Sequence, residues 1–365
     1  MLTHFAVKNF RGFADRIEWN IGNPSNYDFN LYTIKNNVIK IGIIYGPNGS
    51  GKTNFGLAIF DIVNHLTQKK KKFDYLINFA NGGHQGELVD FEYIFTINGY
   101  VLEYNYSKSS NGTLKKEELI VNKKLIFHNE NNSLEISDDF QLKAQTISDL
   151  ANSANNVSII NFLLSSYPLP EDHYLILLQN FVDSMLWFRS VDERDFIGLE
   201  SQVSNIDEYI ISQNLANDFS SFIEETSAQK YNFAKQKPTD KQLKYLVNGQ
   251  ELAFSKPFIS TGTDTLKLLY YWYKHLNNAS FVFIDEFDAF YHFKLSLAVC
   301  RKLFELNCQL FMTTHNTMLM TNDLLRPDCA FILKNNNIKP LNSLTNKELR
   351  FGHNIEKLYR GGTFD

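Results

Sequence analysis

The segment best suited to chemistry is a glycine-rich stretch that ends in a lysine and a threonine. It reads Gly46-Pro47-Asn48-Gly49-Ser50-Gly51-Lys52-Thr53-Asn54 and fits the pattern G-x-x-x-x-G-K-[ST]. Glycines let backbone N–H groups turn inward around phosphate oxygens, and a helix that starts here adds positive potential. Lys52 would reach the β and γ phosphates of a nucleotide, and Thr53 would coordinate Mg²⁺. We therefore expect phosphate contacts from Gly46, Asn48, Gly49, Ser50, Gly51, Lys52, Thr53 and Asn54.

Two adjacent carboxylates follow a run of four apolar residues later in the chain. Phe281-Val282-Phe283-Ile284 predicts a buried strand, and Asp285 and Glu286 come directly after it. The carboxyl edge of a parallel sheet is where α/β proteins bind nucleotides. There Asp285 would orient the Mg²⁺ shell, and Glu286 would polarise the attacking water as general base. An acidic pair that only stabilises a helix dipole is the weaker alternative, because a phosphate-binding loop precedes it.

A histidine follows the next predicted strand along the chain. The strand from Gln309 to Met312 leads into Thr313-Thr314-His315. A single histidine at a strand end is often structural, but this one comes one strand after the carboxylates. We expect His315 to sense the γ phosphate, and we group it with Glu286 and Lys52 as the catalytic candidates.

A second candidate anion site opens a helix shortly before the carboxylates. Ser260-Thr261-Gly262-Thr263 places hydroxyls and a glycine at a predicted helix N-terminus. An ordinary helix cap explains this segment equally well when it is considered alone. One chain does not need two phosphate-binding helix starts for one nucleotide, whereas two chains in a head-to-tail sandwich do.

The elements that must hold these residues form an α/β pattern. A compact apolar strand over 38–45 precedes the glycine-rich loop and a helix over 52–68 follows it, which separates a phosphate-binding loop from a chance glycine turn. After residue 236 strands and helices alternate again. Strands are expected over 243–247, 281–284, 309–312 and 329–333, and helices over 263–276, 291–306, 317–325 and 346–359.

The remaining segments add hairpins and a helical block. Alternating apolar residues predict short strands over 2–7 and 16–20 and β-hairpins over 87–106 and 117–135, the hairpins turning at Asn98-Gly99 and Asn122-Lys123. The period then becomes helical, with helices over 141–153, 157–166, 171–189 and 206–227. We expect a core split by an insertion: an N-terminal lobe over 1–140, a helical insertion over 141–236 and a C-terminal lobe over 237–365.

Composition narrows the class of protein. The 365 residues carry 36 Lys+Arg against 40 Asp+Glu, a formal charge of −4, which argues against a generally basic protein that coats nucleic acid. Cys300, Cys308 and Cys329 form no CxxC pair, so core thiols in a reducing compartment are expected. No signal peptide or uninterrupted apolar span is apparent. A cytoplasmic protein with no membrane partner is the expectation.

Taken together, these motifs resemble the ATP-binding-cassette (ABC) ATPase heads of the SMC/RecF class, and most closely the OLD-like (overcoming lysogenization defect) AAA-type ATPases of bacterial anti-phage and abortive-infection loci. The resemblance covers roughly 1–135 and 240–365. It rests on GPNGSGKTN as Walker A, Ser260-Thr261-Gly262-Thr263 as a shortened signature, Asn9-Phe10-Arg11-Gly12-Phe13, Ile284-Asp285-Glu286-Phe287-Asp288-Ala289-Phe290-Tyr291-His292 as Walker B plus D-loop, and Thr313-Thr314-His315-Asn316 as the switch histidine.

The resemblance implies an ABC-type P-loop head in which a mixed sheet with a parallel core joins an antiparallel β subdomain. It implies ATP and Mg²⁺ as cofactors and a homodimer closed head to tail over two ATP molecules. Arg11 would lie near the nucleotide, while Ser260, Gly262, Thr263 and the D-loop Asp288 would act on the ATP of the partner chain. The signature lacks the second glycine of transporters, and Gln85 is a weak candidate for the Q-loop glutamine. The segment Leu349 to Tyr359 resembles the tail of these ATPases, and packing on the head explains it equally well.

Three functions fit these observations. The first is an ATPase that dimerises with ATP and controls a separately encoded effector, a nuclease or toxin, in anti-phage defence; only six residues follow Tyr359, too few for a fused nuclease. The second is a DNA-repair or chromosome-maintenance ATPase of the RecF/SMC type, which the charge of −4 and the lack of coiled-coil heptads disfavour. The third, a transporter subunit, is disfavoured by the short signature. Contact with nucleic acid through a complex stays open.

Overall fold

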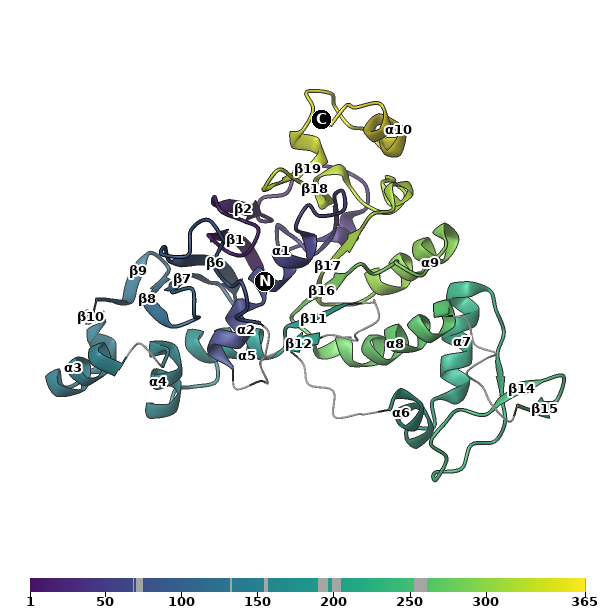
Figure 1. Cartoon of the computed structure of the whole chain (residues 1–365), viewed down its shortest axis with the longest axis horizontal. Coiled ribbons are helices and arrows are strands. Elements are labelled where there is room, and N and C mark those ends of the chain that lie inside the picture. Colours follow the sequence, from purple (N-terminus) through teal and green to yellow (C-terminus); the bar gives the residue numbers. More distant parts are fainter. Residues whose placement is uncertain are drawn as a thin grey trace.

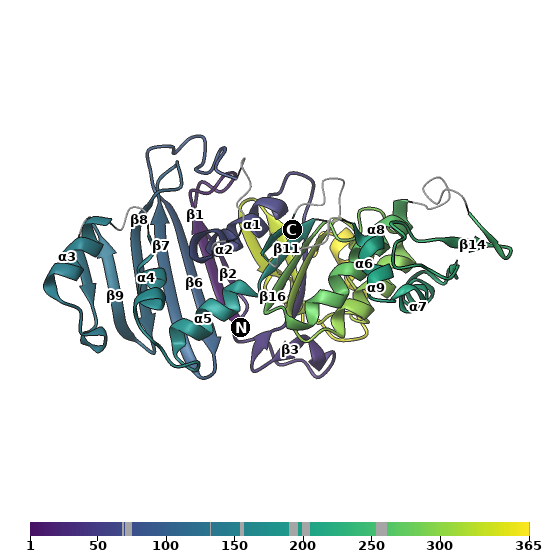
Figure 2. The same cartoon turned by 90° about the horizontal axis from the view of Figure 1, so that it is seen from below.

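The computed structural model describes residues 1–67, 69, 75–131, 133–153, 157–189, 196–198, 205–252 and 261–364. Two seven-stranded sheets form its framework, one antiparallel and one with a parallel centre. Figures 1 and 2 show them side by side, with the antiparallel sheet at one end of the molecule and a group of helices at the other.

The antiparallel sheet confirms the predicted hairpins. Its order is β10-β9-β8-β7-β6-β1-β2, and β6 and β7 pair along their whole length around Asn98-Gly99. Alternate residues of β6 are buried, as the period-two pattern requires. Its strands are β1 (Leu2–Lys8), β2 (Ile17–Asn20), β6 (Val89–Ile97), β7 (Tyr100–Lys108), β8 (Leu114–Val121), β9 (Lys124–Glu130) and β10 (Ser133–Ile136).

The second sheet carries the strands that lead to the predicted motifs. Its order is β12-β11-β16-β17-β5-β18-β19, parallel from β11 to β18 with an antiparallel strand at each edge. Every residue of β5, β16 and β17 is buried, which is why each strand carries an apolar run, over 41–45, 281–284 and 310–312. Its strands are β5 (Ile41–Tyr45), β11 (Leu186–Arg189), β12 (Phe196–Gly198), β16 (Phe281–Asp285), β17 (Gln309–Thr314), β18 (Ala330–Lys334) and β19 (Asn337–Pro340).

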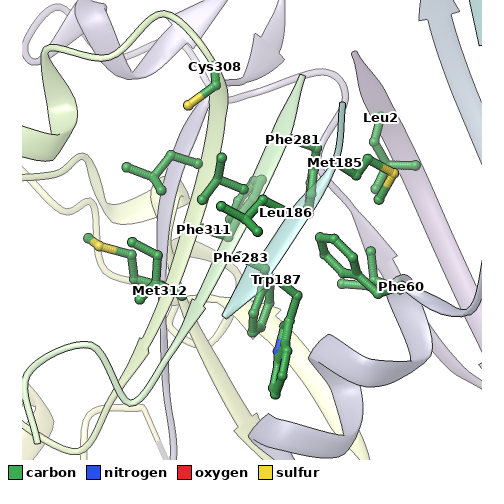
Figure 3. Close-up of a cluster of buried hydrophobic side chains, with 14 of the residues drawn as sticks. Leu2, Phe60, Met185, Leu186, Trp187, Phe281, Phe283, Cys308, Phe311 and Met312 are labelled. Atoms are coloured by element: carbon green, nitrogen blue, oxygen red, sulfur yellow. The ribbon is translucent and has the colours of Figure 1, made fainter. Parts of the chain in front are cut away.

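The predicted helix over 171–189 is wrong in its last part. Helix α5 (Tyr174–Asp183) ends early, and β11 then joins the core sheet in parallel with β16. Figure 3 shows Leu186 and Trp187 of β11 among Phe60, Phe281 and Phe283, so apolar packing on both faces overrides the helical pattern. The segment 141–236 is therefore not wholly helical, and the division at 140 and 236 stays a prediction.

Several predicted helices are shorter or broken in the structure. The helix over 52–68 breaks at Phe60, and the one over 206–227 breaks at 213–215. The segment 317–325 keeps only a 3₁₀ turn, and of the helix predicted over 346–359 only a helix over 355–360 forms. The α-helices not yet given are α1 (Lys52–Ile59), α2 (Asp61–Leu66), α3 (Ala144–Ser153), α4 (Ile159–Ser166), α6 (Ile206–Ser212), α7 (Ala216–Ser227), α8 (Thr261–His275), α9 (Phe293–Phe304) and α10 (Ile355–Arg360).

Short elements complete the described chain. The minor strands are β3 (Ile34–Lys35), β4 (Val38–Ile39), β13 (Asn232–Phe233), β14 (Tyr245–Val247) and β15 (Gln250–Glu251). The 3₁₀ turns are η1 (Leu31–Thr33), η2 (Asp138–Phe140), η3 (Leu276–Asn278), η4 (Thr317–Leu319), η5 (Pro327–Cys329) and η6 (Leu341–Ser343). The three cysteines are buried free thiols. No helix in the described part of the chain has both the length and the apolar character needed to cross a membrane.

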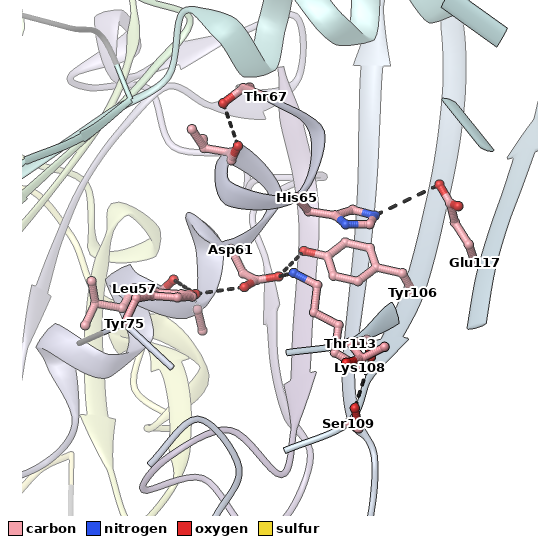
Figure 4. A network of polar contacts seen from close by, with 12 residues as sticks. Leu57, Asp61, His65, Thr67, Tyr75, Tyr106, Lys108, Ser109, Thr113 and Glu117 are labelled. Carbon is pink, nitrogen blue, oxygen red and sulfur yellow. Dashed lines mark hydrogen bonds and ion pairs between the residues drawn. The ribbon is translucent and has the colours of Figure 1, made fainter. Parts of the chain in front are cut away.

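A buried polar cluster ties the helix after the glycine-rich loop to the antiparallel sheet. Asp61 of α2 accepts hydrogen bonds from Tyr75 (2.9 Å) and Tyr106 (2.8 Å), and its Oδ2 lies 2.5 Å from Lys108 Nζ (Figure 4). Asp61 is fully buried, and Lys108 is almost so. Because a buried charge needs a partner, this cluster fixes α2 against β7.

Candidate nucleotide-binding site

The glycine-rich loop leaves the carboxyl end of β5 and enters α1 at Lys52, as predicted. A side chain at Gly46 would bring Cβ within 2.5 Å of the Leu333 carbonyl, and one at Gly51 would bring it within 2.9 Å of Phe13. Gly51 also has φ +95°, a conformation that favours glycine. The loop is thus packed too closely at both positions for any other residue. The loop runs directly into the N-terminus of α1, the end of a helix at which anions bind.

Lys52 is buried and lies within its own loop. Its Nζ donates to the carbonyls of Gly46 (2.8 Å) and Pro47 (3.1 Å), and it lies 3.3 Å from His315 Nδ1. Burial lowers the pKa of Lys52, against the opposing charges of Asp285 and Glu286. The predicted lysine and the predicted switch histidine therefore meet, although 263 positions separate them in sequence.

Asp285 receives hydroxyl groups on both carboxylate oxygens. Thr53 Oγ1 donates to Oδ2 at 2.7 Å, and Thr313 Oγ1 donates to Oδ1 at 2.8 Å. The carboxylate is fully buried, and this burial raises its pKa despite both hydrogen bonds. The two predicted Mg²⁺ ligands, Thr53 and Asp285, are thus in direct contact.

Glu286 adopts an unusual backbone conformation that its neighbour Thr313 supports. Its φ is +50°, in the left-handed region, and its N–H donates to Thr313 Oγ1 at 2.8 Å. Its side chain is 26% exposed, so the carboxylate can reach solvent. Non-glycine residues in this region are often found at functional sites. The next threonine, Thr314, donates to Asp288 Oδ1 at 2.6 Å and so holds the predicted D-loop aspartate.

His315 is held in its neutral form by its surroundings. Desolvation and the neighbouring Lys52 ammonium lower its pKa, against the carboxylates of Glu286 and Asp288. A neutral imidazole has one N–H donor and one acceptor nitrogen, and the ring contacts Lys52 Nζ through Nδ1 at 3.3 Å. The ring also makes a hydrogen bond to the Gly46 backbone, which opposes the lowering of its pKa.

The other predicted residues lie on separate elements. Arg11, with φ +49°, donates to the Tyr75 carbonyl at 3.1 Å, and the adjacent Phe13 packs on Gly51 beside the loop. Gly262 and Thr263 stand in the first turn of α8, where the Thr263 hydroxyl lies 3.2 Å from Tyr231. Ser260 lies outside the described residues. Gln85 donates to the carbonyls of Ala80 and Asn81, in the segment before β6.

Two residues of this site have no role in the sequence-based prediction. Thr313 supports both carboxylates, and Arg189 of β11 lies 3.1 Å from Glu286 and 3.6 Å from Asp285. Arg189 falls in the segment predicted as helix, so its position at the sheet edge could not be expected. The apolar Leu186-Trp187-Phe188 ahead of it is the one signal for a strand.

A family model described as "AAA domain, putative AbiEii toxin, Type IV TA system" matches residues 42–321. This chain belongs to that family. The match spans the glycine-rich loop, the carboxylates and His315, so the AAA-domain assignment covers every residue of the site except Arg11. With the glycine-rich loop after β5 and the acidic residues at the end of β16, this AAA-domain chain has the α/β arrangement of a P-loop domain.

Solved structures of SMC and RecF proteins are similar to the AAA-domain chain at low identity. The SMC head domain from Thermotoga maritima has a TM-score of 0.45 and 15% identity, over 93% of this chain and 98% of that one. RecF-ATP, a recombination mediator protein, has a TM-score of 0.40 and 14% identity, over 93% of this chain and 99% of that one. The Pyrococcus furiosus Smc head bound to a ScpA domain has a TM-score of 0.41 and 12% identity, over 93% of this chain and 95% of that one. No curated protein sequence matches the chain.

Proposed function

We propose that this chain binds ATP with Mg²⁺ and hydrolyses it. The observation that carries the proposal is the joined set Thr53, Asp285, Thr313 and Glu286 at the carboxyl edge of β16, beside Lys52 and His315. Those residues supply a cation for phosphate, oxygen donors for a metal ion and a carboxylate that can reach water.

The oxygen donors fit the cofactor that the resemblance implies. Mg²⁺ prefers hydroxyl, carboxylate and water oxygens. The Thr53 hydroxyl and the Asp285 carboxylate are already in contact, at 2.7 Å. Bound there with ATP, Mg²⁺ would neutralise the charge of the phosphates. Lys52 would exchange the Gly46 and Pro47 carbonyls for phosphate oxygens.

Glu286 and His315 are suited to the remaining steps. The Glu286 carboxylate would orient a water molecule and accept its proton, and its partial exposure and supported backbone favour this role. A ring N–H of His315 would donate a hydrogen bond to the terminal phosphate, where negative charge develops. The Thr314–Asp288 hydrogen bond would keep the D-loop in place beside it.

We further propose that two chains close head to tail around two ATP molecules. Ser260, Gly262 and Thr263 at the start of α8, with Asp288, would then contact the ATP held by the partner chain. Two observations on this chain support the proposal: α8 begins with a hydroxyl- and glycine-rich turn, and Asp288 is held in position beside His315.

Replacing Glu286 by Gln tests both parts. The variant is expected to lose ATP turnover by about 10²-fold or more, because the amide cannot accept a proton, and to accumulate as an ATP-bound dimer. Phosphate release and light scattering with Mg²⁺–ATP measure these effects. Glu348→Gln, an exposed glutamate paired with Arg350, is the matched control. Unchanged turnover in Glu286→Gln would overturn the proposed hydrolysis.

The biological role that we propose is control of a separately encoded nuclease or toxin in cytoplasmic anti-phage defence. The toxin–antitoxin wording of the family description supports this role. Native purification followed by mass spectrometry, with phage challenge of a deletion strain, tests it. Recovery of the ATPase alone together with unchanged phage sensitivity would count against it. Stimulation of ATP turnover by duplex DNA without a partner protein would favour the DNA-repair alternative instead.

A further inference from the structure

A guanidinium group faces the two carboxylates of the site from the neighbouring strand. Arg189 ends β11, and the parallel register of the sheet places it opposite Asp285. Its Nη2 lies 3.1 Å from Glu286 Oε2, and its Nε lies 3.6 Å from Asp285 Oδ2. Within the described residues, the buried Nε has no hydrogen-bond partner of its own. The Arg189 guanidinium is thus held between the carboxylates of Asp285 and Glu286 and contacts both of them.

The oxygen that Arg189 Nε faces is also the one expected to hold the metal ion. Asp285 Oδ2 accepts a hydrogen bond from the Thr53 hydroxyl at 2.7 Å. The guanidinium therefore lies beside the metal-binding site predicted at Thr53 and Asp285. Lys52 provides a positive charge on the loop side of the same carboxylates. A divalent ion bound at Thr53 and Asp285 would lie close to the Arg189 guanidinium. Two positive charges repel each other strongly in a partly buried site.

We propose that Arg189 is a built-in counter-cation that competes with the metal ion for Asp285 and Glu286 until nucleotide arrives. The inference deepens the proposed ATPase function and rests on it. In the nucleotide-free protein the guanidinium neutralises the carboxylates of Asp285 and Glu286 and keeps free divalent ions out. When Mg²⁺ arrives with ATP, the phosphates hold the metal ion, and Arg189 releases Asp285. Release of Arg189 would then make the end of β11 responsive to nucleotide.

The charge at position 189 makes the proposal testable without ATP turnover. Mn²⁺ is the probe, because its free and bound forms are separated by electron paramagnetic resonance. Arg189→Gln keeps a polar side chain of similar reach but removes the charge, and Arg189→Lys keeps the charge but loses the planar guanidinium. Arg350→Gln, at an exposed arginine that pairs only with Glu348 among the described residues, is the matched control.

Nucleotide-free Arg189→Gln is expected to bind Mn²⁺ about tenfold more tightly than the unaltered chain, because a repelling charge is removed. Arg189→Lys should remain within about threefold of the unaltered chain, and Arg350→Gln should match it. Mn²⁺ should also raise the melting temperature of Arg189→Gln more than that of the unaltered chain. This second measurement reports on the proposal if Arg189→Gln is too unstable for a full titration.

Two results would overturn the inference. One is equal or weaker Mn²⁺ binding by Arg189→Gln, which would mean that the guanidinium does not compete with the metal ion. The other is a tenfold loss of ATP binding in EDTA with no change in Mn²⁺ binding, which would make Arg189 a phosphate ligand. Neither measurement requires hydrolysis, so failure of the proposed ATPase function would appear separately, as absent turnover in the unaltered chain.

Discussion

Thr313 organises the candidate site through a single hydroxyl. That hydroxyl donates to the buried Asp285 carboxylate and accepts the Glu286 N–H, so it fixes a metal-binding candidate and a left-handed backbone at once. A hydroxyl that donates and accepts leaves neither neighbour unsatisfied. The chemistry of the site thus depends on a side chain that takes no part in that chemistry.

Replacing Thr313 by Val is expected to reduce the free energy of unfolding by about 1–3 kcal/mol, because two buried groups lose their partner. ATP turnover should fall as well, since Glu286 loses the support for its conformation. Urea unfolding and phosphate release measure the two effects. Thr96→Val on the exposed face of β6 is the control. A Thr313→Val chain as stable and active as the unaltered one would show that Glu286 is held in some other way.

His315 makes the stability depend on pH in a defined direction. Its pKa in the folded chain lies below the ordinary value of 6.5, so in acid the unfolded chain takes up a proton that the folded site resists. Stability should therefore fall as the pH drops below about 6.5 and should not change through this group above about pH 7.5. His315→Gln is expected to flatten this slope in urea unfolding experiments at a series of pH values. An unchanged slope in His315→Gln would refute the assignment.

At the scale of elements, the sequence predicts strands better than helices. Short apolar runs identify β5, β16 and β17, and strict alternation identifies the hairpin of β6 and β7. A strand that is buried on both faces needs an apolar run, and a strand that is buried on one face needs alternating apolar residues. The position of a strand in the fold therefore determines its pattern directly. The site residues that follow the core strands were predictable for the same reason.

What the sequence does not predict depends on distant packing. Leu186 to Phe188 continue the apolar spacing of α5, and only the open edge of β16 makes them a strand. Arg189 reaches the carboxylates through that pairing, and Thr313 acquires its role only when β17 lies beside β16. Tertiary contacts of this kind leave no local pattern.

The cluster around Asp61 gives an element-scale prediction. Replacing Lys108 by Met leaves the buried Asp61 carboxylate with the two tyrosine hydroxyls but no cation, at an expected cost of about 3–5 kcal/mol. Asp61→Asn with Lys108→Met should recover much of that loss. Lys116→Met, at a pair exposed by 36% and 40%, should change stability by less than about 1 kcal/mol. Thermal or urea unfolding distinguishes these outcomes, and equal costs at the two lysines would show that the cluster does not anchor α2.

At the scale of the molecule, one buried amide joins the two sheets. Gln309, at the start of β17, accepts the Leu2 N–H at 2.9 Å and donates to the carbonyls of Leu2 (2.9 Å) and Ile39 (3.0 Å). Around it, Trp19 of the antiparallel sheet packs on Phe311 of the parallel sheet with ring centres 4.5 Å apart. The sheets therefore share a continuous core.

Gln309→Leu is expected to destabilise the chain by on the order of 3 kcal/mol, because three backbone groups lose their partner in a buried position. Urea unfolding followed by tryptophan fluorescence is suitable, since Trp19 lies at the joint. Gln145→Leu, at an exposed glutamine, is the control and should stay within about 0.5 kcal/mol. If Gln309→Leu proved no less stable than this control, the joint would rest on apolar packing alone.

The strand order of the parallel sheet also has a consequence for synthesis of the protein. β5, which carries the glycine-rich loop, pairs with β17 and β18, strands from the last fifth of the chain. A ribosome adding about 5–20 residues per second completes these neighbours well after β5 has emerged. The candidate site therefore assembles only after residue 334 has been synthesised. A nascent or prematurely terminated chain would carry the glycine-rich loop on an unpaired apolar strand, a form that molecular chaperones and proteases can recognise.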